Sequence, residues 1–223
     1  MQEKEKTSKI PWPTKEAMIQ IYEKKLWGDS DEFDYYSGEG SHKEELLEPY
    51  IDVVSSFLTS FDEPLTVCDL GCGDFNVGKR LLKYAREYVA VDIVPDLITY
   101  NRKKIREENL SFACMDLSRD ELPTADCAIL RQVLQHLSND EVQQVTAKLR
   151  TYKYVLLTEH IPVGDFVPNL DIISGQGIRL KKQSGIDLLA PPFNLKVKKE
   201  KEILSITLPG NRGRIVTRSY EMY

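Results

Sequence analysis

The stretch VCDLGCGDFNVG, residues 67–78, decides the fold of this chain. An apolar run with β-branched residues over 65–70 predicts a buried strand, and the run stops at Gly71 and Gly73. The apolar spacing over 77–85 then predicts an amphipathic helix. A glycine turn between a strand and a helix lets a ligand lie against the main chain at the carboxyl edge of a sheet.

The side chains near this turn indicate which kind of ligand it suits. Asp69 precedes the glycines, and a carboxylate there is unfavourable beside a phosphate but favourable beside a cation. Asn76 stands where a dinucleotide fingerprint has glycine or alanine. The turn therefore predicts a positively charged nucleoside ligand rather than NAD.

The rest of the chain repeats the alternation of strand and helix. Further strands are expected over 88–93, 110–115, 125–130 and 152–160, with helices over 95–108 and 142–149 between them. The last strands are expected as a hairpin over 196–208 and 214–222. This alternation predicts a parallel, doubly wound sheet whose ligands bind at the carboxyl ends of the strands. Polar residues fall at such ends, namely Asp69, Asp92, Asp116, Arg131 and Glu159.

The segment V-C-D-L-G-C-G resembles the first motif of class I S-adenosylmethionine-dependent methyltransferases, and residues 131–138 are similar to the family's V-L-x-H-L segment. The resemblance implies an α/β fold with a doubly wound, mostly parallel seven-stranded Rossmann-like sheet and an N-terminal helical lid. It implies S-adenosyl-L-methionine as cofactor, with Asp92 on the ribose and Asp116 near the adenine. The full set of implied cofactor-binding residues is Asp69, Gly71, Gly73, Asn76, Asp92, Ile93, Asp116, Leu117 and Arg131.

The N-terminal part, residues 1–60, is expected to be a helical segment with a lid. A helix is predicted over 13–27, and Ser41 with Glu44 matches a capping box for a helix over 42–60. The acidic and aromatic loop at 29–41 has two compatible interpretations, a solvated linker or a lid over the cofactor. The S-G-x-G-S run at 37–41 resembles a segment of one bacterial methyltransferase subfamily, which implies that Tyr36 and Ser41 face the methionine end of the cofactor or the substrate.

Residues 61–223 are expected to form the methyltransferase domain, with a substrate-recognition insertion near 161–192. Glycine, proline and polar residues replace periodicity in that insertion, and long irregular loops in compact domains are often functional. Arg179 is the substrate-binding candidate that the subfamily resemblance implies, although Ile178 stands where the subfamily tends to have tryptophan.

Methyl transfer needs alignment, and it needs a base only when the acceptor is protonated. The candidate catalytic residues are His160, Glu159 and His136, with a structural role as the alternative for His136. Arg131 would bind an acidic substrate or pair with Asp116 or Glu159. The four cysteines are expected to be buried free thiols, and no metal is expected.

Composition narrows the function classes. The 223 residues carry a net charge of -5, which gives no general attraction to nucleic acid. No apolar run approaches a membrane span, and the first residues lack a signal-peptide core, so a cytoplasmic location is expected. The sequence predicts a methyltransferase for a small-molecule or glycan-type acceptor. The alternatives are a catalytically degenerate cofactor-binding module and, less favoured because of Asn76, a nicotinamide-dependent oxidoreductase. The oligomeric state stays open.

Overall fold

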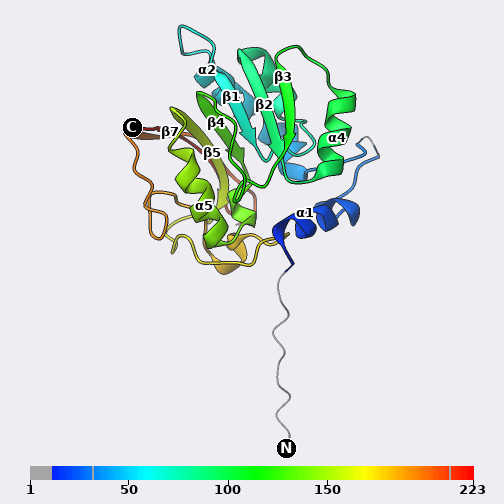
Figure 1. Ribbon diagram of the computed structural model, residues 1–223. Helices are drawn as coiled ribbons and strands as arrows, with labels where there is room; N and C mark the ends of the chain where they lie inside the picture. The colour runs from blue at the N-terminus through cyan, green and yellow to red at the C-terminus, as the bar shows by residue number, and fades with distance from the viewer. Residues whose placement is uncertain (1–11, 32, 211) are drawn as a thin grey trace, which may run out of the picture.

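A seven-stranded sheet organises the computed structural model, which describes residues 12–31, 33–210 and 212–223 (Figure 1). The strand order is β3-β2-β1-β4-β5-β7-β6. The first five strands run parallel, whereas β7 is antiparallel to both β5 and β6. The mostly parallel, doubly wound sheet is confirmed. The strand bounds are β1 Thr66–Leu70, β2 Glu87–Asp92, β3 Leu110–Cys114, β4 Cys127–Arg131, β5 Tyr154–Ile161, β6 Lys199–Thr207 and β7 Arg214–Glu221.

Helices cover both faces of the sheet. The helix bounds are α1 Thr14–Glu23, α2 Glu44–Leu58, α3 Gly78–Leu81, α4 Pro95–Lys104 and α5 Asn139–Leu149. Apolar side chains of α2 and α3 pack on one face, and those of α5 pack on the other. Helix α1 lies across the carboxyl edge of the parallel strands, below the sheet in Figure 1.

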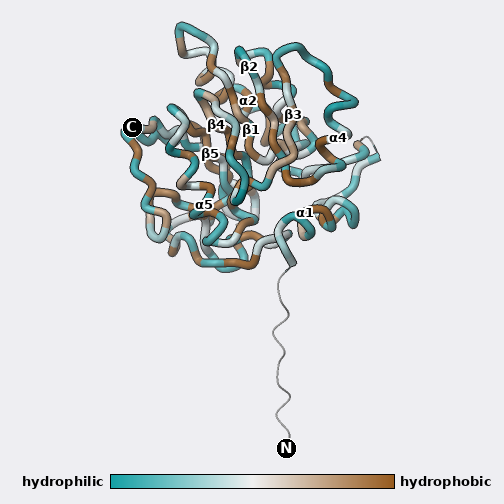
Figure 2. Tube along the Cα trace, in the orientation of Figure 1, coloured by the Kyte–Doolittle hydropathy of each residue, from teal (hydrophilic) through white to brown (hydrophobic). Residues whose placement is uncertain are grey.

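Burial on both faces explains why the central strand is apolar throughout. Val67 contributes to the core on the α2 side, while Cys68 and Leu70 contribute to the core on the α5 side, as the two-residue period of a strand requires. In Figure 2 the hydrophobic colour follows the central strands, and the outer turns are largely hydrophilic. The sequence around residue 67 therefore becomes the middle of the sheet, with its glycine turn at the carboxyl edge.

Several local expectations are corrected. The helix after the glycine turn is a single turn, Gly78–Leu81, followed by a 3-10 turn at Leu82–Tyr84, rather than one helix to residue 85. Ser41 does not cap α2, because it belongs to the 3-10 turn Glu39–Ser41 and the N-cap is Lys43, without a side-chain hydrogen bond.

Two further details differ from the sequence-based expectations. The capping box lies at α5, where the side chain of Ser138 and that of Glu141 satisfy each other's backbone amides. Cys68, Cys72 and Cys127 are buried, but Cys114 is exposed near the edge of the sheet. Within the described residues, no helix combines the length and the apolar character needed to cross a membrane.

Candidate active site

A cavity of about 470 Å³ opens at the carboxyl edge of the sheet. Its volume lies within the range of about 300 to 1,000 Å³ that is usual for ligand pockets. The glycine turn and the ends of β1, β2 and β4 form the floor, and α1 contributes Thr14, Met18 and Tyr22 to the opposite wall. The loop 37–41 completes the enclosure. Most of the predicted cofactor residues line this cavity: Asp69, Gly71, Gly73, Asp92, Ile93, Asp116, Leu117 and Arg131.

The glycine turn has no free amide to offer a phosphate. The four consecutive amides of residues 71–74 donate in order to the Val91 carbonyl twice, at 2.8 and 2.9 Å, to the Asp92 carboxylate at 3.0 Å and to the Ser37 hydroxyl at 2.9 Å. Phosphate-binding glycine turns use such amides for the anion itself. This turn therefore suits a ligand without a pyrophosphate.

Two buried carboxylates flank the turn. Asp69 accepts a hydrogen bond from the Tyr88 hydroxyl at 2.9 Å, and burial raises the pKa of Asp69 to about 7. Asp92 accepts from the amides of Gly73 at 3.0 Å and Val94 at 3.1 Å, and burial raises the pKa of Asp92 as well. Carboxylates in such surroundings favour a ligand that brings a positive charge or hydroxyl donors.

The third acid stands at the end of β3. One Asp116 oxygen accepts from the amide and the hydroxyl of Ser118, at 2.9 and 2.6 Å, which holds the side chain of Asp116 at the cavity wall. Leu117 and Ile93 add apolar surface to the same cavity. Apolar surface together with a carboxylate fits a flat base that carries an amino group.

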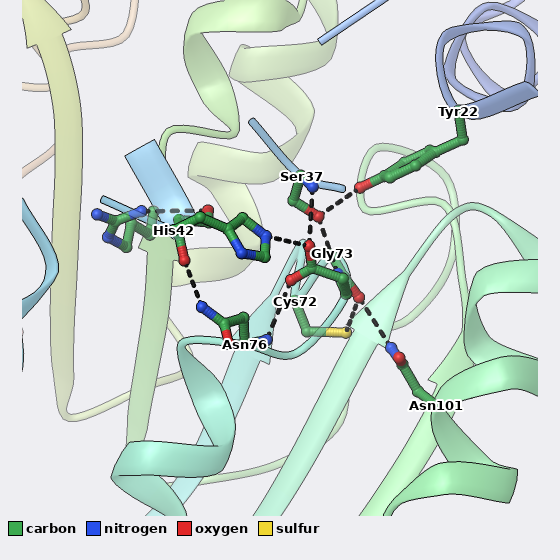
Figure 3. Close-up of polar contacts among 10 residues, drawn as sticks. Tyr22, Ser37, His42, Cys72, Gly73, Asn76 and Asn101 are labelled. Carbon is green, nitrogen blue, oxygen red and sulfur yellow. Dashed lines mark hydrogen bonds and ion pairs between the residues drawn. The ribbon is translucent and has the colours of Figure 1, made fainter. Parts of the chain in front are cut away.

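The loop at 37–41 is fastened to the glycine turn (Figure 3). The Ser37 hydroxyl lies 2.9 Å from the Tyr22 hydroxyl, and the Ser37 amide donates to the Asp74 carboxylate at 2.8 Å. His42 Nε2 lies 2.7 Å from the same carboxylate. Tyr22, Ser37, His42 and Asp74 were not predicted from the sequence. Tyr22 fits the apolar stripe of the predicted helix, which gave no sign of a polar role. The serine of the S-G-x-G-S run was the available signal for Ser37.

Arg131 and Asn76 hold the same loop from below. The Arg131 guanidinium donates to the Gly40 carbonyl at 2.5 Å and to the Ser41 hydroxyl at 3.4 Å, and it lies over the Tyr50 ring at 4.7 Å. The Asn76 amide group donates to the Ser41 carbonyl at 2.6 Å. Asn76 is not among the cavity-lining residues, so the structure places it behind the loop rather than beside the ligand.

Gln132, also missed by the sequence analysis, lies at a strained position of the floor. Its φ of 58° is in the left-handed region, and its amide donates to the Thr158 carbonyl at 2.7 Å. A side chain on Gly40 would come within 2.7 Å of Gln132 Oε1, so the loop 37–41 packs closely against the Gln132 side chain at this glycine. Strained backbone of this kind is concentrated at functional sites.

The two candidate histidines differ in whether one ring nitrogen is available to accept a proton. His136 Nδ1 lies 3.1 Å from the Gly175 carbonyl, which can only accept, so Nδ1 carries the proton. Nε2 of His136 then accepts from the Gln135 amide group at 3.3 Å, and burial lowers the pKa of His136 to about 4. Both ring nitrogens are used, and the ring packs against Trp27 with a centroid distance of 5.1 Å.

His160 keeps one nitrogen available. Its Nε2 lies 2.5 Å from the Arg212 carbonyl and therefore donates, which leaves the lone pair on Nδ1. His160 lines the cavity and is partly buried. Of the two histidines, His160 alone has the free acceptor nitrogen that a base requires.

Three predicted site residues point elsewhere. Glu159 is 3% exposed, and its two oxygens accept from the amides of Leu134 and Gln135, both at 3.1 Å. Burial raises the pKa of Glu159 to about 8 against the opposing effect of Arg179 and the two amides. The Arg179 side chain is fully buried and donates to backbone carbonyls. Tyr36 stacks on His42 with a centroid distance of 4.4 Å. None of the three is among the residues that line the cavity.

The described residues contain no group of three or more His, Cys, Asp or Glu side chains arranged to hold a metal ion.

Residues 67–152 match the family model described as a methyltransferase domain. A segment of 60 residues is 38% identical to malonyl-[acyl-carrier protein] O-methyltransferase from Acetivibrio thermocellus. That segment is 26% of this chain and spans only 21% of the length of that relative.

Solved structures match over much more of the chain. The N-methyltransferase NodS from Bradyrhizobium japonicum, in complex with S-adenosyl-L-homocysteine, has a TM-score of 0.64 at 12% identity, covering 92% of this chain and 98% of that one. Magnesium protoporphyrin IX methyltransferase from Synechocystis, with bound S-adenosylmethionine, has a TM-score of 0.58 at 14% identity, covering 96% and 100%. The 1,6-didemethyltoxoflavin-N1-methyltransferase from Burkholderia thailandensis has a TM-score of 0.58 at 14% identity, covering 94% and 87%. Residues 67–152 thus match a methyltransferase domain, and the chain has the fold of these solved S-adenosylmethionine-dependent methyltransferases.

Proposed function

We propose that this protein is an S-adenosylmethionine-dependent methyltransferase that acts on a small-molecule or glycan-type acceptor. The observation that carries the proposal is the chemistry of the cavity floor. Three carboxylates surround a glycine turn whose amides are all engaged within the protein. This arrangement suits a cationic nucleoside and disfavours a dinucleotide.

The lining residues would hold the cofactor in three parts. Asp92 would accept from the ribose hydroxyls, Asp116 from the adenine amino group, and Asp69 would face the positive methionine end. Gly71 keeps the turn in place, since a side chain there would come within 2.4 Å of the Val133 methyl group in the cavity wall. When bound, the cofactor supplies an electrophilic methyl group on a sulfonium, which transfers by in-line displacement.

The protein's own contribution is orientation, exclusion of water and removal of a proton. Residues of helix α1 and of the loop 37–41 line the cavity, which limits the directions from which an acceptor can approach the methyl group. His160 Nδ1 would take the proton of a hydroxyl or ammonium acceptor, because its partner nitrogen is fixed as the donor to Arg212. Glu159 is not proposed as a base, since backbone amides occupy both of its oxygens.

The size of the enclosure supports a small acceptor. The acceptor would enter beside Gln132, His160 and Lys181, which also line the cavity. The solved structures of similar fold include enzymes named for small acceptors, such as 1,6-didemethyltoxoflavin and magnesium protoporphyrin IX. These names concern those proteins and support the acceptor class proposed here only through the shared fold.

The first test is calorimetric titration of the purified protein with S-adenosylmethionine, S-adenosylhomocysteine and NAD in parallel. Binding of the first two with dissociation constants of about 1 to 100 µM, and no binding of NAD, is the expected result. Binding of NAD alone would overturn the proposal.

Turnover is tested separately with cofactor labelled with tritium in its methyl group. A panel of small hydroxyl, amine and carboxyl compounds and soluble glycans is offered as acceptor, and transfer to one of them is expected. Cofactor binding without transfer to any acceptor would favour the degenerate module over the enzyme.

A further inference from the structure

One 3-10 turn forms a shared wall of the cavity. The turn Leu134–His136 follows β4, and the turn residues Gln135 and His136 line the cavity together with the flanking Val133 and Leu137. Val133 faces the glycine turn, because a side chain on Gly71 would meet the Val133 methyl group at 2.4 Å. The His136 ring packs against Trp27, in the N-terminal segment that follows α1. The position of this turn therefore sets the space between the glycine turn and Trp27.

Two buried side chains hold the turn, one through its backbone amides and the other through its backbone carbonyls. Glu159, in β5, accepts the amides of Leu134 and Gln135, both at 3.1 Å. Arg179, from the segment between β5 and β6, donates to the carbonyl of Leu134 at 3.1 Å and to that of Leu137 at 2.8 Å. The carboxyl group of Glu159 accepts from the amides and the guanidinium of Arg179 donates to the carbonyls, and the bonds from the guanidinium are charge-assisted.

The pair is not a simple ion pair. Glu159 and Arg179 do not lie within salt-bridge distance of each other. Each shifts the pKa of the other only by a longer-range electrostatic interaction. The second Arg179 nitrogen also donates to Asn139 Oδ1 at 2.7 Å, which ties the turn to the start of α5. Gln135 extends the arrangement, since its Oε1 accepts from the His160 amide at 3.2 Å. Both side chains thus bind the backbone of the wall and not each other.

We propose that Glu159 and Arg179 are positioning residues that clamp the turn 134–137 and thereby set the affinity of the cavity for the cofactor. This inference rests on the proposed function for the identity of the ligand. It assigns the irregular segment between β5 and β6 a specific task, because Arg179 is its contribution to the clamp. The clamp acts through the wall, since neither charged side chain lines the cavity.

Trp27 gives a direct readout of the wall. The chain has two tryptophans, and replacing the exposed Trp12 by Phe leaves Trp27 as the reporter against His136. In this background, Glu159→Gln keeps the shape of the side chain but turns an amide N–H₂ toward one of the two backbone amides. Arg179→Lys keeps the charge but cannot fork between two carbonyls.

The experiment titrates S-adenosylhomocysteine into the parent, the two single variants and the double variant, followed by Trp27 fluorescence and calorimetry. Each single variant is expected to bind about tenfold more weakly, with Trp27 emission shifted to longer wavelength. The double variant is expected to lie within about threefold of the weaker single variant, because both residues hold one turn. The matched controls are Glu202→Gln and Arg214→Lys in the hairpin ion pair, at 3.4 Å, and both are expected within about twofold of the parent.

The outcomes separate this inference from the proposed function. Parent protein that fails to bind S-adenosylhomocysteine overturns the proposed function and this inference with it. Parent protein that binds, with both folded variants within about twofold of it, overturns this inference alone. Should either single variant not fold, Asn139→Ala decides, since it removes one acceptor of the guanidinium. It is expected to weaken binding about threefold, and unchanged affinity would count against the clamp.

Discussion

The amide of Gly73 donates a hydrogen bond to the carboxylate of Asp92 across 3.0 Å. This bond joins the end of β2 to the glycine turn after β1, two segments that the sequence separates by 19 positions. It fixes one Asp92 oxygen, and Val94 fixes the other at 3.1 Å. The remaining lone pairs of the carboxylate are thereby oriented for a ligand on the cavity side.

Replacing Asp92 by Asn is expected to weaken S-adenosylhomocysteine binding about tenfold or more. An amide group cannot accept both backbone amides and also take the ribose hydroxyls, and hydrogen bonds to a charged group contribute about 1.5 to 3 kcal/mol. Calorimetry on Asp92→Asn beside Asp96→Asn, an exposed acid of α4, makes the comparison. An Asp92→Ala variant with affinity within about twofold of the parent would show that the ribose assignment is wrong.

Gly73→Ala is expected to destabilise the protein more than Gly210→Ala does. Both glycines have positive φ, at 56° and 69°, so both substitutions introduce backbone strain. At Gly73 the new carbon would also meet Ser37 Oγ at 2.5 Å, whereas nothing lies within 4 Å at Gly210. Urea denaturation is expected to show a loss of about 1 kcal/mol for Gly210→Ala and a larger loss for Gly73→Ala. Equal losses would show that the loop 37–41 can move away from the new side chain without lowering the free energy of unfolding.

Cofactor binding is expected to release a proton near neutral pH. Burial raises the pKa of Asp69 from 3.8 to about 7, so the free folded protein retains a proton there that an unfolded chain would lose. The stability contribution of Asp69 therefore falls as pH rises from about 4 to 7. A cationic ligand beside Asp69 favours the ionised form, so affinity should rise with pH through 7.

Calorimetry in two buffers with different ionisation enthalpies measures that proton. The parent should show a buffer-dependent enthalpy at pH 7, and Asp69→Asn should show none. A parent enthalpy that is the same in both buffers would place the positive end of the ligand away from Asp69.

Stability is expected to fall at acid pH because of His136. Burial lowers the pKa of His136 from 6.5 to about 4, so the unfolded chain takes up a proton that the folded chain excludes. This group stabilises the fold above pH 6.5 and loses up to about 2 kcal/mol of that contribution by pH 5. Urea midpoints at pH 7 and pH 5 should move less in His136→Asn than in the parent. The same pH dependence in both proteins would refute the assignment.

His160→Gln is expected to lower turnover on an identified acceptor about 100-fold while leaving cofactor affinity unchanged. The Gln amide can still donate to the Arg212 carbonyl, but the Nδ1 lone pair is lost. Removal of a general base typically costs about 10²- to 10⁴-fold. Tritium transfer assays give kcat, and calorimetry gives the cofactor affinity. Full turnover in this variant would show that no base resides at His160.

Local patterns in the sequence were enough to predict the strands, their parallel arrangement and the sheet edge at which the cavity opens. Apolar runs of five or six residues followed by Gly71, Asp92 or Arg131 are local patterns, and the carboxyl ends of parallel strands meet at one edge whatever the rest of the chain does. Asp69 and Asp92 were predictable for this reason, since each lies at the carboxyl end of its strand.

Which polar side chains reach the cavity depends on long-range packing that no local pattern predicts. Glu159 and Arg179 have the residue types of a catalytic acid and a substrate-binding arginine, yet each is used on backbone groups of the turn 134–137. Ser37 reaches the glycine turn across a separation of 37 positions, which no local pattern encodes. Periodicity fixes the face of a strand or helix on which a side chain lies. The partner that a buried charge must find there depends on where distant segments pack, because a charge removed from water is tolerated only with such a partner.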